Sequence, residues 1–126
     1  MPISIKRLLT VVIFLTAGVA KAATVFDGIY LCSLIVIGVG TTDQYVTVVS
    51  NAAGVTVFAP AGVAQTNDVY GYGIGRVSQT TFTGQTNYGR PFTLNQNQTT
   101  GGMYGSADLA IQGRLFNVLM ACERVL

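Results

Sequence analysis

The chain of 126 residues has no histidine and no tryptophan, and its last lysine is Lys21. Without histidine there is no imidazole for general-base catalysis or for metal ligation. Without lysine in the rest of the chain there is no amine for a Schiff base. The few basic residues also exclude the clustered positive patch that nucleic-acid binding needs. We therefore expect no nucleic-acid partner, no metal, no cofactor and no enzymatic activity.

The first 22 residues have the features of a cleavable export signal, and we expect residues 23–126 to form the mature protein as a single domain. A short positive region (Lys6, Arg7) precedes an uncharged run of 13 residues that ends at the small-residue site Ala20-Lys21-Ala22. A bilayer-spanning helix needs about 20 apolar residues, so this run is too short for an anchor. The short leader favours a bacterial protein that is exported to the periplasm or outside the cell, and secretion from a eukaryotic cell is the alternative.

Removal of this leader changes the sign of the net charge. The whole chain has a formal charge of +2, but three of its seven basic residues lie in the leader. Residues 23–126 keep four arginines against four aspartates and one glutamate, which gives a side-chain charge of −1. The expected product is therefore almost neutral.

Two cysteines, Cys32 and Cys122, lie near the two ends of the expected mature chain. In an oxidising compartment an even number of cysteines normally forms disulfides, and here only one intramolecular pairing exists. The bond closes a loop of about 90 residues, for which loop-closure entropy predicts about 4–5 kcal/mol of stabilisation. It also requires the first and last strands to lie side by side, with Cα atoms about 5.5–6 Å apart. A redox-active pair is disfavoured because the CxxC spacing is absent.

The sequence beyond Val25 favours β-strands and shows no helical pattern. It is rich in Val, Thr, Tyr, Phe and Ile, and Gly, Asn or Asp interrupts it every ten to fifteen residues. Pro60 lacks an N–H, so we expect a bulge, an edge register or a break after Ala59. Eight strands are predicted: Gly28–Ile37, Gln44–Asn51, Val55–Ala64, Val69–Ser78, Thr80–Thr83, Arg90–Asn97, Met103–Gln112 and Arg114–Val125.

The connections between these strands are too short for parallel crossovers, so consecutive strands are expected to pair antiparallel. The predicted fold is all-β: a single antiparallel meander of about 7–8 strands, closed into a small barrel or curled sandwich with the N- and C-terminal strands adjacent. Closure removes exposed strand edges. Gly28–Ile37 and Leu115–Cys122 are apolar on both faces, which predicts strands covered on two sides. A chain of this size predicts a filled core rather than a large pocket.

The most distinctive motif is Tyr70-Gly-Tyr-Gly-Ile-Gly75. Its GxGxG spacing differs from a dinucleotide fingerprint, and no helical pattern follows it. In a strand, its glycines share one face, which allows a sharp bend or the packing of an aromatic ring on bare backbone. A ligand lying on that face is the alternative. We call this segment the tyrosine strand, and its candidate surface or ligand residues are Tyr70, Gly71, Tyr72, Gly73 and Gly75.

Three further features have two interpretations each. The six tyrosines suit a saccharide-binding surface, but ordinary half-buried strand residues are favoured because tryptophan, the usual stacking platform, is absent. The amide-rich tract 95–102 suits either a solvated hairpin end, which we favour, or an amyloid-like ladder. The five carboxylates permit a two-acid hydrolase, but no spacing pairs them and turn chemistry explains most of them.

These features predict a small exported, non-catalytic β-protein that acts as a binding or interaction module for an unidentified protein or small ligand. Its binding surface is expected on the tyrosine strand or at the polar hairpin ends. The alternative is a structural subunit that polymerises by β-strand addition or amyloid-like stacking, motivated by the low charge and the Asn/Gln/Thr/Gly tracts. An Asp-dependent hydrolase is a third candidate, although no nucleophile–base pair is visible.

Overall fold

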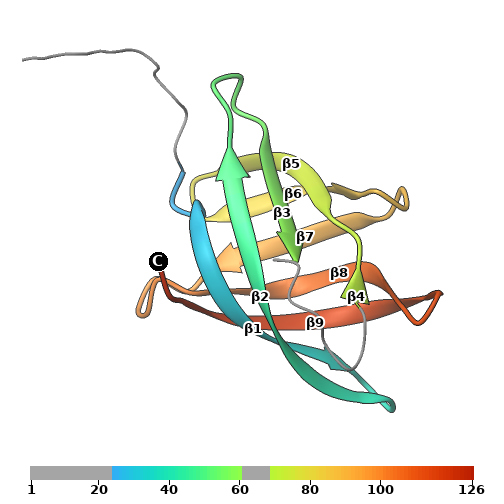
Figure 1. The fold of residues 1–126 in the computed structure, drawn as a ribbon. Coiled ribbons are helices and arrows are strands. Elements are labelled where there is room, and N and C mark those ends of the chain that lie inside the picture. Colours follow the sequence, from blue (N-terminus) through green and yellow to red (C-terminus); the bar gives the residue numbers. More distant parts are fainter. Residues whose placement is uncertain (1–23, 61–68) are drawn as a thin grey trace, which may run out of the picture.

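The computed structural model describes residues 24–60 and 69–126 (Figure 1), so the predicted leader lies outside the described residues. The described residues contain nine strands and no helix, and accordingly no helix there has the length and hydropathy needed to cross a bilayer. The strands are β1 (Gly28–Val36), β2 (Gly40–Ser50), β3 (Thr56–Pro60), β4 (Val69–Tyr70), β5 (Gly73–Ser78), β6 (Thr81–Thr86), β7 (Pro91–Gln96), β8 (Met103–Ile111) and β9 (Arg114–Arg124).

Eight of these strands close into an antiparallel barrel. Around the ring the order is β1, β2, β3, β5, β6, β7, β8 and β9, and β9 pairs with both β8 and β1. The first and last strands of the ring are therefore neighbours (Figure 1). The ninth strand, β4, adds to β8 beyond the stretch that pairs with β7. The predicted all-β meander with adjacent terminal strands is confirmed, and its closed form is a barrel.

Two predicted strand boundaries are wrong because the turns are shorter than the sequence suggested. β2 begins at Gly40 rather than Gln44, since the residues from Gly40 to Asp43 pair with the end of β1. β6 continues to Thr86 rather than ending at Thr83, and it pairs with β5 along its whole length. Thr41 and Asp43, which were interpreted as turn residues, occupy exposed strand positions, whereas Thr42 lies on the inward side of β2 and Thr86 at the end of β6 is buried.

The predicted strand Val69–Ser78 is divided into β4 and β5. The chain leaves β8 after Tyr70 and joins β3 and β6 from Gly73 onward, and Gly71 at the change of partner has a φ of 127°. Only glycine adopts such a φ readily, so this residue permits the bend.

Pro60 ends β3 and lies opposite Val46 in an uninterrupted register. The sequence predicts a bulge, an edge register or a break after Ala59. The register shows no bulge, and the strand ends at Pro60, one residue beyond the expected break. The rest of the predicted strand, residues 61–64, lies outside the described residues.

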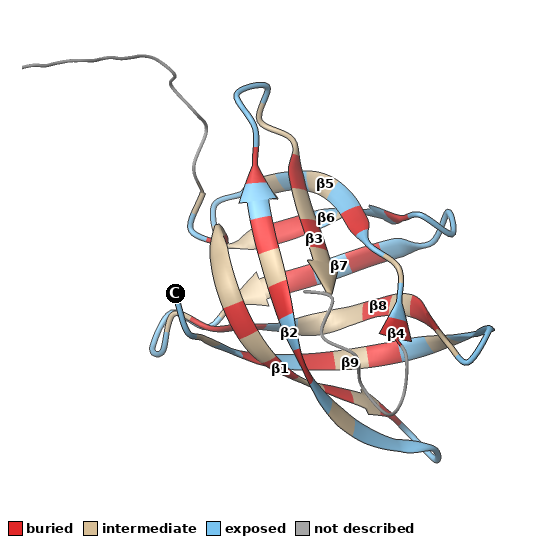
Figure 2. Ribbon diagram, viewed as in Figure 1, coloured by how far each residue is buried: buried red, intermediate tan, exposed pale blue. Residues whose placement is uncertain are grey.

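Inward-facing side chains fill the barrel, and buried residues alternate with more exposed ones along most strands (Figure 2). Four phenylalanines, Phe26, Phe58, Phe82 and Phe92, form the centre of the core, with neighbouring ring centroids 4.9–6.1 Å apart. Three of the four ring pairs are edge-on, which is a favoured aromatic geometry. The expected filled core is thus observed.

The glycines of the tyrosine strand make room for these rings. A Cβ atom added to Gly73 would collide with the Phe58 ring and would lie 2.7 Å from Cε2 of Phe92. A Cβ atom on Gly71 would lie 2.9 Å from Cε2 of Tyr88. The prediction that aromatic rings pack on bare backbone here is confirmed.

The prediction that the two cysteine-bearing strands are covered on both sides is wrong. In β1 the inward Cys32 and Leu34 are buried, whereas the outward Leu31 and Ile35 are only partly buried. In β9 the outward Leu115 is 41 % exposed. The barrel wall is a single layer, so its outer face meets solvent even where its residues are apolar.

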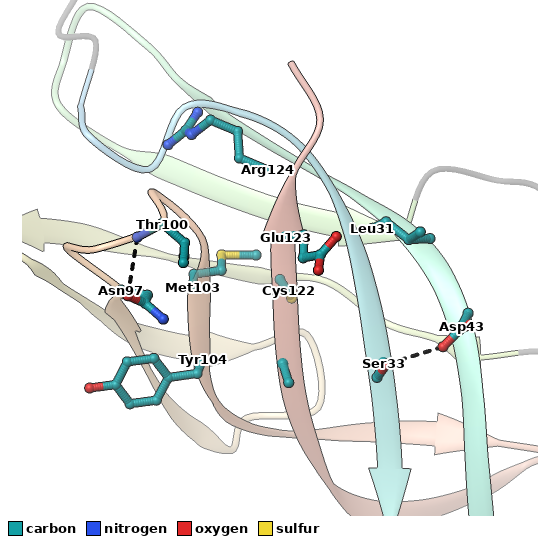
Figure 3. Close-up of a pocket in the computed structure, with 11 residues that line it drawn as sticks. Leu31, Ser33, Asp43, Asn97, Thr100, Met103, Tyr104, Cys122, Glu123 and Arg124 are labelled. Carbon is teal, nitrogen blue, oxygen red and sulfur yellow. Dashed lines mark hydrogen bonds between the residues drawn. The ribbon is translucent and has the colours of Figure 1, made fainter.

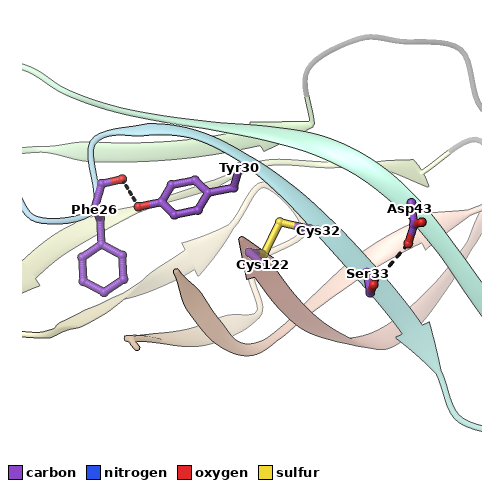
Figure 4. The surroundings of a disulfide bond; sticks show 6 residues. All are labelled: Phe26, Tyr30, Cys32, Ser33, Asp43 and Cys122. Carbon is purple, nitrogen blue, oxygen red and sulfur yellow. Dashed lines mark hydrogen bonds between the residues drawn. A yellow bond between two sulfur atoms is a disulfide. The ribbon is translucent and has the colours of Figure 1, made fainter. Parts of the chain in front are cut away.

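Cys32 and Cys122 form a disulfide, as predicted (Figure 4). They lie directly opposite each other on the neighbouring strands β1 and β9, and their side chains point into the core. Their Cα atoms are 3.9 Å apart, closer than the predicted 5.5–6 Å, because the residues form a directly opposed cross-strand pair.

Arg124 joins the two ends of the described chain at one end of the barrel. Its guanidinium donates hydrogen bonds to the carbonyl oxygens of Val25 and Asp27 and to Oη of Tyr30, the last over 2.7 Å. Its Nε donates to the carbonyl oxygen of Gly101 over 3.1 Å. The Arg124 Cζ atom also lies 4.9 Å from the centroid of the Tyr30 ring, a cation–π distance.

Candidate functional site

A depression of about 660 Å³ lies on the outside of the barrel wall, across β2, β1, β9 and β8 (Figure 3). We call it the outer-wall groove. Its volume falls within the range typical of small-ligand sites. Its lining residues are Leu31, Ser33, Asp43, Asn97, Thr100, Met103, Tyr104, Ala121, Cys122, Glu123 and Arg124.

Four of these residues form a line across neighbouring strands, which we call the cross-strand row. Asp43 of β2 lies opposite Ser33 of β1, Ser33 lies opposite Ala121 of β9, and Ala121 lies opposite Tyr104 of β8. All four positions alternate with buried residues, so their side chains face outward. Since adjacent strands lie ~4.8 Å apart, the row spans roughly 14 Å of wall.

The row has a polar end and an aromatic end. At one end, Ser33 Oγ donates a hydrogen bond of 3.1 Å to Oδ1 of Asp43 (Figure 3). At the other end, the Tyr104 side chain is 52 % exposed. The small side chains of Ser33 and Ala121 lie between them, so the floor is low and a ligand can approach the wall.

Further polar groups surround the row. Asn97 Oδ1 accepts hydrogen bonds from the backbone N–H groups of Thr99, at 3.1 Å, and of Thr100, at 3.3 Å, the second of which is drawn in Figure 3. These bonds hold the turn between β7 and β8. Glu123 is exposed and lies opposite Leu31, two residues along the strands from the Ser33–Ala121 pair. The groove thus offers two carboxylates, a hydroxyl, an amide and an aromatic ring.

The tyrosine strand lies elsewhere on the barrel, in β4 and β5. Tyr70 and Tyr72 are exposed on its outer side, and the Tyr88 hydroxyl donates a long hydrogen bond of 3.5 Å to the Tyr70 carbonyl. Aromatic rings cover Gly71 and Gly73, as described above, so the surface that this segment presents consists of its two tyrosines and Ile74. Gly75 lies against the backbone of Thr83. The structure does not bring these residues to the outer-wall groove.

The six tyrosines do not form one surface. Tyr30 is fully buried, and its hydroxyl donates to the carbonyl oxygen of Phe26 over 2.8 Å. Burial raises the pKa of Tyr30, partly offset by the nearby positive charge and hydrogen bond of Arg124. Among the exposed tyrosines, Tyr104 alone lines the outer-wall groove.

The aspartates that the structure describes have local partners. Asp27 accepts hydrogen bonds from the hydroxyl groups of Ser50 and Thr24, at 2.6 and 2.8 Å. Burial alone would raise the pKa of Asp27, but these bonds and those from the backbone N–H groups of the same residues outweigh it and lower the pKa. Asp108 pairs with Arg90 over 3.5 Å and accepts a bond from Asn117. Asp43 and Glu123 line the outer-wall groove. The remaining carboxylate, Asp68, lies outside the described residues.

Sequence reasoning did not identify the cross-strand row. Its members are separated by up to 88 positions in the chain, and no local motif connects them. The usable signal was the cysteine pair: if Cys32 lies directly opposite Cys122, antiparallel register places Ser33 opposite Ala121. The remaining pairs follow only from the registers of the two hairpins.

Among residues 24–60 and 69–126, no three His, Cys, Asp or Glu side chains are grouped so as to hold a metal ion. In comparisons with known proteins, no family, no curated protein and no solved structure matched this chain.

Proposed function

We propose that the protein is an exported, non-catalytic binding module whose outer-wall groove holds a short saccharide. The observation that carries this proposal is the cross-strand row, in which a carboxylate, a hydroxyl, a methyl group and an aromatic ring follow one another across four adjacent strands.

This order of groups matches the two kinds of surface on a saccharide. The C–H face of a sugar ring is apolar and packs on an aromatic ring, which Tyr104 supplies with an exposed face. Sugar hydroxyl groups donate to carboxylates, and bonds to an ionised acceptor are about twice as strong as neutral ones. Asp43 and Glu123 provide such acceptors along the groove. A floor of small side chains about 14 Å long leaves room for more than one sugar ring.

Export is supported by two independent features. The leader pattern in residues 1–22 is that of a signal peptide. The Cys32–Cys122 disulfide is of a kind that persists in oxidising compartments such as the periplasm or the extracellular space.

A non-catalytic role is supported by the chemistry of the side chains. The chain has no histidine, and Asp27 and Asp108 are engaged in hydrogen bonds with their neighbours. The groove has two carboxylates, Asp43 and Glu123, and Asp43 already accepts a hydrogen bond from Ser33. The groove therefore suits recognition rather than an acid–base step.

Saccharide binding is tested with the purified, oxidised protein on a glycan array, followed by isothermal titration calorimetry of the best-bound oligosaccharide. Tyr104→Ala and Asp43→Asn should each weaken binding about tenfold, because they remove the stacking ring and the charged acceptor. Tyr72→Ala is the matched control: Tyr72 is 43 % exposed, lies between β4 and β5, and does not line the groove.

Two results would contradict the proposal. The first is an array without any bound glycan. The second is binding that Tyr72→Ala abolishes and Tyr104→Ala leaves intact, which would move the site to the tyrosine strand.

Polymerisation by strand addition has less support. Each of the eight barrel strands is paired on both sides within the described residues, so an added strand finds little free edge. Size-exclusion chromatography over a range of concentrations distinguishes the two functions: the binding module predicts a constant small species, and the polymerising subunit predicts growth with concentration.

A further inference from the structure

A second depression, separate from the outer-wall groove, lies at one end of the barrel between the β1–β2 and β8–β9 hairpins, which extend together in Figure 1. We call it the barrel-end pocket. Its volume is about 630 Å³, and it shares no residue with the outer-wall groove. Its lining residues are Leu34, Val36, Val39, Gly40, Thr41, Thr42, Ile111, Gln112, Arg114 and Phe116.

The inner wall of this pocket is apolar. Leu34 and Val36 are inward-facing residues of β1 that belong to the hydrophobic core, and Ile111 and Phe116 pack against that core from β8 and β9. The pocket is therefore the open end of the barrel interior rather than a hollow of the outer wall. An apolar ligand body placed there would continue the core outward.

Among the described residues that line the pocket, Arg114 is the one that carries a charge, and this charge is positive. Arg114 is exposed, and its Cζ atom lies 5.5 Å from the centroid of the Phe116 ring. The lining includes no carboxylate. In the part of the chain that the structure describes, the ion pair formed is Arg90–Asp108, so the charge of Arg114 has no carboxylate partner there.

A buried acceptor lies further along the inward face of β2 than the pocket residues. Gln44 is the next inward-facing residue of β2 after Thr42, and it is 4 % exposed. Its Oε1 atom accepts no hydrogen bond from the described residues. Buried acceptors are normally paired, but Gln44 does not line the pocket, so it gives no support to a ligand there.

We propose that the barrel-end pocket binds a small amphipathic acid. Its apolar body packs against Leu34, Val36 and Phe116, and its carboxylate pairs with the Arg114 guanidinium at the rim. Guanidinium and carboxylate match in bidentate geometry, and the pairing gains strength beside the apolar surface of Phe116. The site is independent of the saccharide groove, since its residues, charge and location are different.

The test compares an acid with a neutral molecule of the same length. Octanoate and 1-octanol are titrated into the oxidised protein while backbone amide chemical shifts are recorded by NMR. We expect octanoate to bind about tenfold more tightly, with shifts concentrated in residues 34–42 and 111–116. A parallel titration with 2-naphthoate distinguishes an aromatic acid from an alkyl acid, and Arg114-dependent binding of either one supports the proposal.

Variants at the rim distinguish recognition of the carboxylate from nonspecific hydrophobic binding. Arg114→Gln should weaken octanoate binding about tenfold and leave 1-octanol binding unchanged, and Arg114→Lys should retain part of the preference. Val39→Glu, at a residue that is 65 % exposed, should also weaken acid binding, because it adds a negative charge beside the carboxylate. Arg76→Gln is the control, since Arg76 lies on β5 and donates to the Ala53 carbonyl instead.

Three outcomes would overturn the proposal: binding of neither acid, equal binding of octanoate and 1-octanol, or the same loss of octanoate binding in Arg76→Gln. Should Arg114→Gln fail to fold, Val39→Glu gives the same comparison from a solvent-facing residue. Because the saccharide titration uses other residues, failure here leaves the proposed function standing, and failure there leaves this pocket standing.

Discussion

At the residue scale, the carboxylate of Asp27 connects the segment before β1 to the end of β2. Both of its oxygens accept bonds from Ser50, and Oδ1 also accepts bonds from Thr24. Ser50 in turn shares a hydrogen bond of 2.8 Å with the buried Thr56 of β3. This polar cluster fixes the chain on both sides of Phe26 and just before Tyr30 enters the core.

The lowered pKa of Asp27 predicts acid sensitivity. A group whose pKa is lower in the folded state stabilises the fold above its unfolded pKa, and this stabilisation is lost as the pH falls through the folded pKa. The free energy of unfolding should therefore decrease below about pH 4, near the unfolded pKa of an aspartate. Asp27→Asn should lower stability at neutral pH and flatten this decrease. Urea denaturation at several pH values measures both effects.

The control for this prediction is Asp43→Asn, because Asp43 accepts one exposed hydrogen bond from Ser33. It should change the free energy of unfolding less than Asp27→Asn does. An Asp27→Asn protein as stable as the wild type at neutral pH would show that the cluster contributes nothing.

At the scale of elements, β5 depends on glycine where it crosses the aromatic core. Gly73 lies opposite Phe58 on β3, and its missing side chain makes room for the Phe58 and Phe92 rings. The bend before β5 uses Gly71. The glycine-rich motif is thus explained by packing and chain direction, which is the interpretation that the sequence favoured.

Gly73→Ala should destabilise the protein by about 2–3 kcal/mol, because the added methyl group overpacks the aromatic core. Gly89→Ala is the matched control: it has a φ of 74° in a turn, and its Cβ would meet open space. The control should cost only about 1 kcal/mol, from backbone strain. Thermal or urea unfolding measures both, and equal costs would show that the rings do not require the bare backbone.

The strands of this barrel were predictable where inward and outward residues differ in polarity. Ala107, Leu109 and Ile111 share the inward face of β8, and the polar residues Ser106 and Asp108 lie on the other face. The coverage of β1 and β9 was not predictable, since outward residues such as Leu31 and Leu119 are apolar although they lie on a single-layer wall. Inward residues of these two strands and most of their outward residues are apolar, so the sequence shows no clear alternation of polarity that would distinguish the two faces.

The candidate groove was not predictable for a different reason. Asp43, Ser33, Ala121 and Tyr104 become neighbours through three strand registers, and a shift of one residue in any register would turn a member of the row inward. Alternation predicts which face a residue occupies but not which residue lies opposite it. Only the cysteines provide a register directly.

At the scale of the whole molecule, the disulfide joins the first and last strands of the ring, where β1 and β9 are also hydrogen-bonded neighbours. The loop that it closes spans 90 residues, most of the described chain. Its main effect is therefore expected on the unfolded state, whose conformational freedom it restricts.

The double variant Cys32→Ser, Cys122→Ser should keep its β-sheet circular dichroism spectrum but lose about 4 kcal/mol of stability. Urea denaturation of this variant and of the oxidised protein measures the difference. The control is the reaction of the purified protein with a maleimide in the absence of a reductant. If both cysteines react, the disulfide is absent and the barrel closes by hydrogen bonds alone.

Closure of the barrel brings β2, β1, β9 and β8 together, and we propose that the groove on their outer side binds an oligosaccharide. The most direct measurement is an NMR map of backbone amide shifts as the best-bound oligosaccharide from the glycan array is added to the oxidised protein. If the groove binds the oligosaccharide, the shifts should be concentrated in residues 31–33, 43, 97–104 and 121–123. Shifts centred on residues 70–75, or no shifts at saturating oligosaccharide, would contradict the proposal.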